Sequence, residues 1–246
     1  RSVPRAARGE AGPVIERFQT RKTEALLACL ALPAGQPRDR EALADLLWPD
    51  APPDAGRNRL TQAVVWLRPQ LEPPGTARGS VLVADRQSVA LGADAVHTDV
   101  AAFEDALKRA AGETAPEERA TWLRTAVDLY RGPLLPRLDD EWVLGLRQRL
   151  LDQFLGALRA LIAHEEAAGR LETALAYARR AHVADPLAED AYLDVIRLLA
   201  ASGQVSAARR QYREMERVLA DTLGEEPSPA ARALLDALRR GDAVAG

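Results

Sequence analysis

The chain has 246 residues, a formal net charge of −3 and a single cysteine. The length accommodates two domains of ordinary size, the near-neutral charge excludes a uniformly basic coat for nucleic acid, and one cysteine excludes a disulfide within the chain. Apolar residues make up 47% of the sequence but aromatic residues only 4%. Because the apolar residues are mostly Ala and Leu, which favour helices over strands, we expect a mainly α-helical protein.

The cellular location follows from what the sequence lacks. No apolar run approaches the length of a transmembrane helix, and the first residues contain no apolar signal segment. Cys29 lies within the apolar run from Leu26 to Leu30 and is expected to be an inert core thiol. We therefore expect a cytoplasmic protein without membrane contacts. The first residue is not Met, which suggests a trimmed product or a fragment.

The first hundred residues predict three helices and a hairpin. Residues 1–16 are rich in Arg, Gly and Pro and predict a weakly ordered lead-in, with an edge strand at residues 13–18. Proline and glycine bound helices expected at residues 20–32, 39–48 and 55–71. The third has one buried face, formed by Leu60, Val64, Leu67 and Leu71. Two β-rich runs, residues 81–83 and 89–91, flank polar residues and predict a hairpin. This order is typical of a winged helix-turn-helix.

From residue 98 onward the pattern is purely helical. Helices are expected at residues 98–111 and 116–130, followed by a long one from about residue 139 to 168. The tripeptides that begin at Gly169 and Gly203 lie between helices and are 34 residues apart, which is the tetratricopeptide period. Two further pairs keep this offset: Ile162 with Ile196 and Ala174 with Ala208. We predict an all-α tetratricopeptide-like repeat domain, the alternative being a helical bundle with an accidental period.

Several strings in this order of parts match a known family. They are Arg21–Leu27, Arg40–Trp48, Arg57–Leu60, Leu129–Leu134, Glu141–Trp142 and Asp185–Ala191. The chain resembles the bacterial transcriptional activator domain family, which includes the Streptomyces antibiotic regulatory proteins, over about residues 14 to 238. The resemblance implies a winged-helix domain of DNA-binding type at residues 1–96 and a bacterial transcriptional activator, tetratricopeptide-like domain at residues 97–246. Because only about 20 residues precede the first helix, we expect the family's N-terminal sheet to be incomplete.

The resemblance also points to residues that would contact DNA. In a winged helix, the third helix enters the major groove and reads base edges. Its outward polar positions are Arg57, Arg59, Thr61, Gln62 and Arg68, with Gln62 suited to adenine and Thr61 to a phosphate or a thymine methyl. The further phosphate contacts expected are Arg86 at the hairpin tip and Arg21 and Lys22 at the start of the first helix. Residues 1–99 carry 13 basic and 12 acidic residues, so ordinary solvated charges are the alternative.

Other positions favour protein contacts. Family members usually carry basic or small polar residues where Val65, Trp66 and Pro69 stand here, and Pro69 is expected to kink or end the helix. Trp66 is interpreted either as an anchor between the two domains or as a contact for a protein partner. A cluster on the repeat domain, Arg209, Arg210 and Arg213, could bind an acidic peptide or a phosphate-bearing ligand, the alternative being a solvated face.

No pattern in the sequence predicts catalysis, a metal site or a cofactor. The three histidines are far apart, and the only zinc-helix candidate, His164-Glu165-Glu166, has Ala168 where a second histidine would stand. We predict a transcriptional regulator that binds promoter DNA, with the repeat domain contacting RNA polymerase or forming a homodimer. The alternative is a degenerate family member that does not read DNA and acts as a protein- or small-ligand-binding adaptor.

Overall fold

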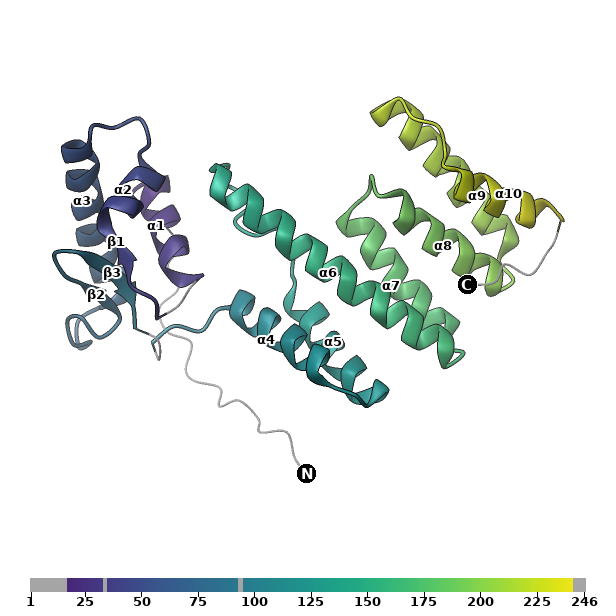
Figure 1. The fold of residues 1–246 in the computed structure, drawn as a ribbon, viewed down its shortest axis with the longest axis horizontal. Helices are drawn as coiled ribbons and strands as arrows, with labels where there is room; N and C mark the ends of the chain where they lie inside the picture. The colour runs from purple at the N-terminus through teal and green to yellow at the C-terminus, as the bar shows by residue number, and fades with distance from the viewer. Residues whose placement is uncertain (1–16, 33–34, 93–94, 241–246) are drawn as a thin grey trace. The chain divides into compact units, whose positions relative to one another are not determined.

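The computed structural model of the chain describes residues 17–32, 35–92 and 95–240. These residues form two compact units that meet in sequence between Thr98 and Asp99 (Figure 1). Most of the edge strand expected at residues 13–18 lies outside the described residues, and Arg17 and Phe18 are not in a strand. The expected lead-in at residues 1–16 is likewise outside the described part.

The first unit contains three helices and a three-stranded antiparallel sheet. In chain order the elements are α1 (Arg21–Ala31), β1 (Arg38–Asp39), α2 (Arg40–Leu47), α3 (Pro53–Leu71), β2 (Leu82–Ala84) and β3 (Ser88–Leu91). The strand order is β1-β3-β2, with Arg38 opposite Val89 and Leu82 opposite Leu91. Side-chain caps begin the first two helices, because Thr20 Oγ1 accepts from the Thr23 amide and Asp39 Oδ1 from the Ala42 amide.

Three details of this unit differ from the sequence expectation. β1 was not expected, because a two-residue strand leaves no alternation to detect; Asp39 both ends this strand and caps α2. α3 begins at Pro53, two residues early, because proline is favoured in the first turn of a helix. Pro69 does not end α3, which continues to Leu71 and closes with the Glu72 amide donating to Arg68 O at 2.7 Å. A proline this near the end of a helix removes only one backbone hydrogen bond.

The core of the first unit is made mainly of leucines at helical spacing. Those with an exposure of 1% or less include Leu26, Leu30, Leu43, Leu47, Leu60, Leu67, Leu82 and Leu91. On α3 the expected inward face is confirmed for Leu60, Val64 and Leu67, whereas Leu71 is only half-buried. This face of α3 packs on α1 and α2, and the opposite face remains exposed.

The second unit is a run of helices in which each packs against the next. Its elements are α4 (Asp99–Gly112), α5 (Pro116–Leu129), α6 (Glu141–Ala167), α7 (Leu171–Ala184), α8 (Glu189–Ala201), α9 (Val205–Val218), a π-helical turn η1 (Leu219–Leu223) and α10 (Pro229–Arg240). Consecutive helices from α4 to α9 are in contact, and Figure 1 shows them layered in chain order. Two adjoining cores fill the unit, and α6 contributes to both, with Phe154 and Leu158 in the first and Ile162 in the second.

The 34-residue period corresponds to two equivalent helix pairs, α6–α7 and α8–α9. Gly169 and Gly203 stand between the helices of each pair with φ of 72° and 75°, the left-handed conformation that glycine adopts without strain. Both turns close alike, with the Arg170 amide donating to Glu165 O and the Gln204 amide to Leu199 O, each at 2.8 Å. The paired positions Ile162, Ile196, Ala174 and Ala208 are all buried. The predicted fold class, mainly α with a small sheet, is confirmed.

Candidate nucleic-acid interface

The outward face of α3 is the surface that the sequence assigned to base reading. Arg57, Arg59, Thr61 and Gln62 are exposed on it. Arg59 and Gln62 make no side-chain hydrogen bond or ion pair with any described residue. They lie three positions apart and so stand next to one another on the helix. A cation and an amide side by side on an exposed helix face can contact both phosphates and base edges.

Two of the α3 arginines are engaged within the protein. Arg57 pairs with Glu41 of α2 at 2.9 Å and with Asp54 at 3.0 Å, in an exposed network. Arg68 has a side chain only 20% exposed and donates through Nη1 to Glu72 Oε2 at 2.6 Å. The sequence reasoning missed both pairings because Glu41 and Glu72 lie outside the helix segment that it considered. The structure therefore brings Arg59 and Gln62 to the open face and directs Arg68 toward the hairpin.

Glu72 joins the end of α3 to the loop that leads into β2. Its carboxylate, in a side chain 2% exposed, accepts from Arg68 and from the amides of Gly79, Val81 and Leu82 at 2.9 to 3.0 Å. Burial alone would raise the pKa of Glu72, but these three amides and Arg68 together lower it to about 2. The ionised carboxylate thus fixes the start of the hairpin to the helix.

Arg40 provides a second connection between the hairpin and α3. From the first residue of α2, its guanidinium donates to Thr61 Oγ1 of α3 at 3.0 Å and to Asp85 O, in the β2–β3 turn, at 3.3 Å. Thr61 Oγ1 also donates to Arg57 O at 2.9 Å. The hydroxyl that the sequence offered to DNA is therefore already bonded within the protein. One guanidinium reaches both elements, so the turn lies beside the outward face of α3.

The β2–β3 turn presents Arg86 to solvent. Asp85 Oδ1 accepts from the amides of Gln87 and Ser88, both at 2.7 Å, and so shapes the turn around Arg86. The Ser88 amide, followed by that of Gln87, lowers the pKa of Asp85. Arg86 is exposed at the tip, where a wing would contact a phosphate. At the start of α1, Arg21 is exposed and Lys22 half-buried.

The outward face of α3 also carries two large apolar side chains. Val65 is 57% exposed and Trp66 is 37% exposed. Exposed apolar side chains in a row beside a positively charged face add an area that a protein partner could cover. Trp66 therefore keeps a place among the candidate protein contacts of the first unit.

In the second unit, the three arginines predicted to contact a ligand have different environments. Arg209 donates through Nη2 to Leu238 O at 2.8 Å and so ties α9 to α10. Arg210 and Arg213 are exposed on α9. Arg209 therefore joins two helices, whereas Arg210 and Arg213 are solvated cations.

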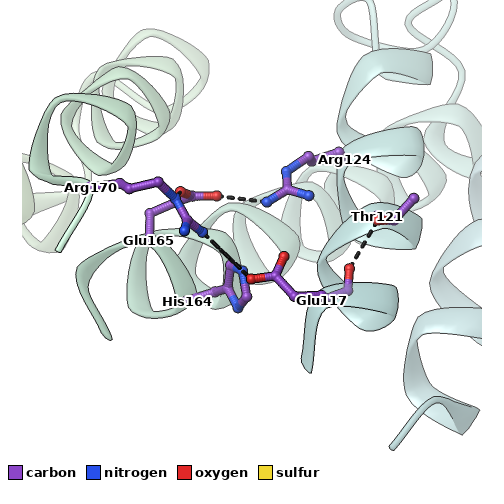
Figure 2. Close-up of polar contacts among 6 residues, drawn as sticks. All are labelled: Glu117, Thr121, Arg124, His164, Glu165 and Arg170. Atoms are coloured by element: carbon purple, nitrogen blue, oxygen red, sulfur yellow. Dashed lines mark hydrogen bonds and ion pairs between the residues drawn. The ribbon is translucent and has the colours of Figure 1, made fainter. Parts of the chain in front are cut away.

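A polar cluster at the junction of α5, α6 and α7 is built around Glu165, which sequence reasoning considered only as part of a zinc motif. Figure 2 shows its carboxylate held between Arg124 of α5, at 2.8 Å, and Arg170 at the start of α7. The hydrogen bond from Arg170, opposed by burial and aided by Arg124, lowers the pKa of Glu165. His164 stands 3.3 Å from the Glu117 carboxylate. Because Glu165 is 1% exposed and both its oxygens are paired, the cluster is a closed clamp between helices.

Two further properties concern the described part of the chain. No group of three or more His, Cys, Asp or Glu side chains there is arranged to hold a metal ion. None of the helices described is both long enough and apolar enough to cross a bilayer.

These features define a winged-helix unit joined in sequence to a helical repeat unit. The family model for the bacterial transcriptional activator domain matches residues 98–239, more than half of the sequence. The chain therefore belongs to the bacterial transcriptional activator domain family, and the resemblance inferred from the sequence strings is confirmed.

Among relatives, the chain is 29% identical over 225 residues to the transcriptional regulatory protein EmbR of Mycobacterium tuberculosis, covering 90% of this chain and 58% of EmbR. It is 28% identical over 232 residues to the regulatory protein DnrI of Streptomyces peucetius, covering 90% of this chain and 85% of DnrI. The solved structure of M. tuberculosis EmbR in complex with a low-affinity phosphopeptide matches with a TM-score of 0.67 at 28% identity. That match covers 91% of this chain and 60% of the EmbR chain, so this chain spans less than two thirds of EmbR.

Proposed function

We propose that the protein regulates transcription by binding promoter DNA through α3 and the β2–β3 wing. We assign DNA binding to the domain at residues 1–96 and protein contacts, with RNA polymerase or a second copy, to the domain at residues 97–246. The observation that carries the proposal is the link made by Arg40 between Thr61 and the wing turn. This link sets the wing turn, which bears Arg86, beside the exposed face of α3 that bears Arg59 and Gln62.

The residues of this surface differ in the role that we propose for each of them. Arg59 and Arg86 would neutralise phosphates, and Gln62 would pair with an adenine edge. Arg57 keeps an exposed guanidinium that could exchange its carboxylate partners for phosphate, and Arg21 and Lys22 would add backbone contacts at the start of α1. Arg68 and Thr61 act indirectly in this scheme, because their polar groups hold the wing and α3 in register.

A mobility-shift assay with genomic fragments at about 50 and 200 mM salt tests the proposal. Arg59→Ala and Arg86→Ala should each weaken binding on all sequences by about 1 kcal/mol or more and lower the salt slope by about one counterion. Arg159→Ala, an exposed arginine of α6, is the matched control and should bind as the unaltered protein does. If Arg59→Ala and Arg86→Ala both bind DNA as tightly as the control does, the assigned surface is wrong.

A second function is favoured by Val65 and Trp66, which expose apolar area on α3. In this alternative the unit no longer reads DNA and serves as an adaptor for a protein. The same assay separates the two functions, because an adaptor gives no shift at either salt concentration. Trp66→Ala would then weaken partner binding by 2 kcal/mol or more, as is typical of a central aromatic anchor.

A further inference from the structure

A pocket of about 680 Å³ opens on the second unit between α6, α7 and the segment that follows α5. It is lined mostly by apolar side chains, with arginines at its margin, and its volume falls within the range of cavities that hold small organic ligands. Neither the winged helix nor the proposed protein contacts use it.

The floor of the pocket is aromatic. The ring of Tyr130 stacks on that of Phe154, with centroids 4.1 Å apart and ring planes 16° apart. The guanidinium carbon of Arg180 lies 6.0 Å from the Phe154 centroid. At the rim, Leu144 is 46% exposed and Val183 is 76% exposed, an unusual exposure for aliphatic side chains that line a cavity. This combination favours a ligand with a flat apolar body.

The charge around the pocket is positive. Three arginines line it, and no Asp or Glu does. Among the described residues, Arg147 donates to neutral carbonyls alone, those of Leu134, Leu135 and Leu138, each at 2.9 Å. Arg179 is exposed and has no ion-pair or hydrogen-bond partner within the described ranges. Arg180 bonds to Val127 O and lies 3.4 Å from the exposed carboxylate of Asp128. An anion would therefore gain two or more cationic partners that the protein leaves largely unneutralised.

The wall beside Tyr130 is held in place before any ligand arrives. Leu135, which follows the lining residues Gly132 and Pro133 but is not itself in the lining, has a φ of 46°, a left-handed conformation that is strained for a leucine. The three bonds from Arg147 hold the carbonyls of Leu134, of Leu135 itself and of Leu138. These bonds tie to α6 the segment that supplies Gly132 and Pro133 to the pocket lining.

We propose that this pocket binds a small aromatic organic anion. Its rings lie against Tyr130 and Phe154, and its carboxylate or sulfonate lies at Arg179 and Arg180. All the residues of this site belong to the second unit.

The test uses two fluorescent naphthalene probes, the anionic 8-anilinonaphthalene-1-sulfonate and the neutral N-phenyl-1-naphthylamine, with the full chain and no DNA. The anionic probe should bind at one site per chain and more tightly than the neutral one. Arg179→Glu should weaken the anionic probe roughly tenfold and leave the neutral probe unchanged. Gln148→Trp, which places an indole in the pocket from an exposed position on α6, should abolish both. Competition by 2-naphthoate, but not by 2-naphthol, should reproduce the preference for an anion.

Arg159→Glu, a charge reversal on α6 outside the pocket lining, is the matched control and should change neither probe. Circular dichroism of each variant checks that the helices are retained. Several equivalent probe sites, an equal loss in Arg179→Glu and Arg159→Glu, or full binding in Gln148→Trp would each overturn the proposal. Because DNA is absent, these results do not depend on whether the first unit binds a promoter.

Discussion

Replacing Glu72 by Gln tests how the wing is joined to α3. Glutamine has nearly the shape of the protonated acid, so the variant reports the free energy that the carboxylate charge contributes. The pKa of Glu72 falls from 4.5 to about 2 in the folded protein. This shift corresponds to about 3 kcal/mol of stability at neutral pH. Glu41→Gln, which removes an exposed partner of Arg57, is the matched control and should cost less than about 0.5 kcal/mol.

The effect of Glu72→Gln should depend on pH in a defined direction. Because the folded pKa lies below the unfolded one, the stabilisation is complete well above pH 4.5 and is lost as the pH falls toward about 2. At pH 3 the difference in free energy of unfolding between the two proteins should shrink to about 1.5 kcal/mol. Urea titrations followed by the NMR cross-peaks of Leu82 and Val89 measure it in the first unit alone. A difference that stays constant from pH 7 to pH 3 would refute the assignment of this stability to the ionised carboxylate.

Three other substitutions follow from the packing. Arg68→Ala should loosen the wing and speed hydrogen exchange at the Leu82 amide, yet leave the salt slope of DNA binding unchanged; a lower slope would show that Arg68 contacts phosphate directly. Glu165→Gln should destabilise the second unit by about 2 kcal/mol in urea unfolding, because two partly exposed arginines lose a buried, charged hydrogen-bond acceptor, and a cost below about 1 kcal/mol would contradict the clamp. Gly203→Ala should lower stability by about 1 kcal/mol because φ is 75°, whereas Gly156→Ala, inside α6 with open space around it, should raise stability by a similar amount.

The elements that the sequence predicted best are those with a regular apolar period. Leu60 and Leu67 of α3 and the pairs spaced by 34 residues lie where their spacing places them, because helix geometry converts spacing directly into a face. The bounds of α1 and α2 matched to within one residue, because both expected helices began at residues that the structure shows to be caps, Thr20 and Asp39, and ended before a proline. β1 could not be found in this way, because its two residues are paired only through contacts with a distant strand.

The candidate site was less predictable than the fold for a related reason. The sequence shows that Arg57, Arg59 and Arg68 lie on one helix, but their different environments depend on carboxylates supplied by other segments. Arg40 lies within one of the sequence strings that match the family, but the sequence assigned it no role. Its partners Thr61 and Asp85 lie 21 and 45 residues away and become apparent only in the structure. The roles of Arg59, Gln62 and Arg86 remain predictions from exposure and placement.

The long helix α6 has a consequence for how the second unit comes apart. At 27 residues it extends about 40 Å, and its side chains enter both cores of the unit. In arrays whose repeats meet only their neighbours, terminal repeats can unfold while the rest persists. Because α6 belongs to both cores, unfolding one core alone is costly: it would expose half of α6 while the other half stays packed in the remaining core. The unit should therefore unfold as one cooperative block, with the pocket wall near the start of α6 and the Glu165 clamp near its end lost together.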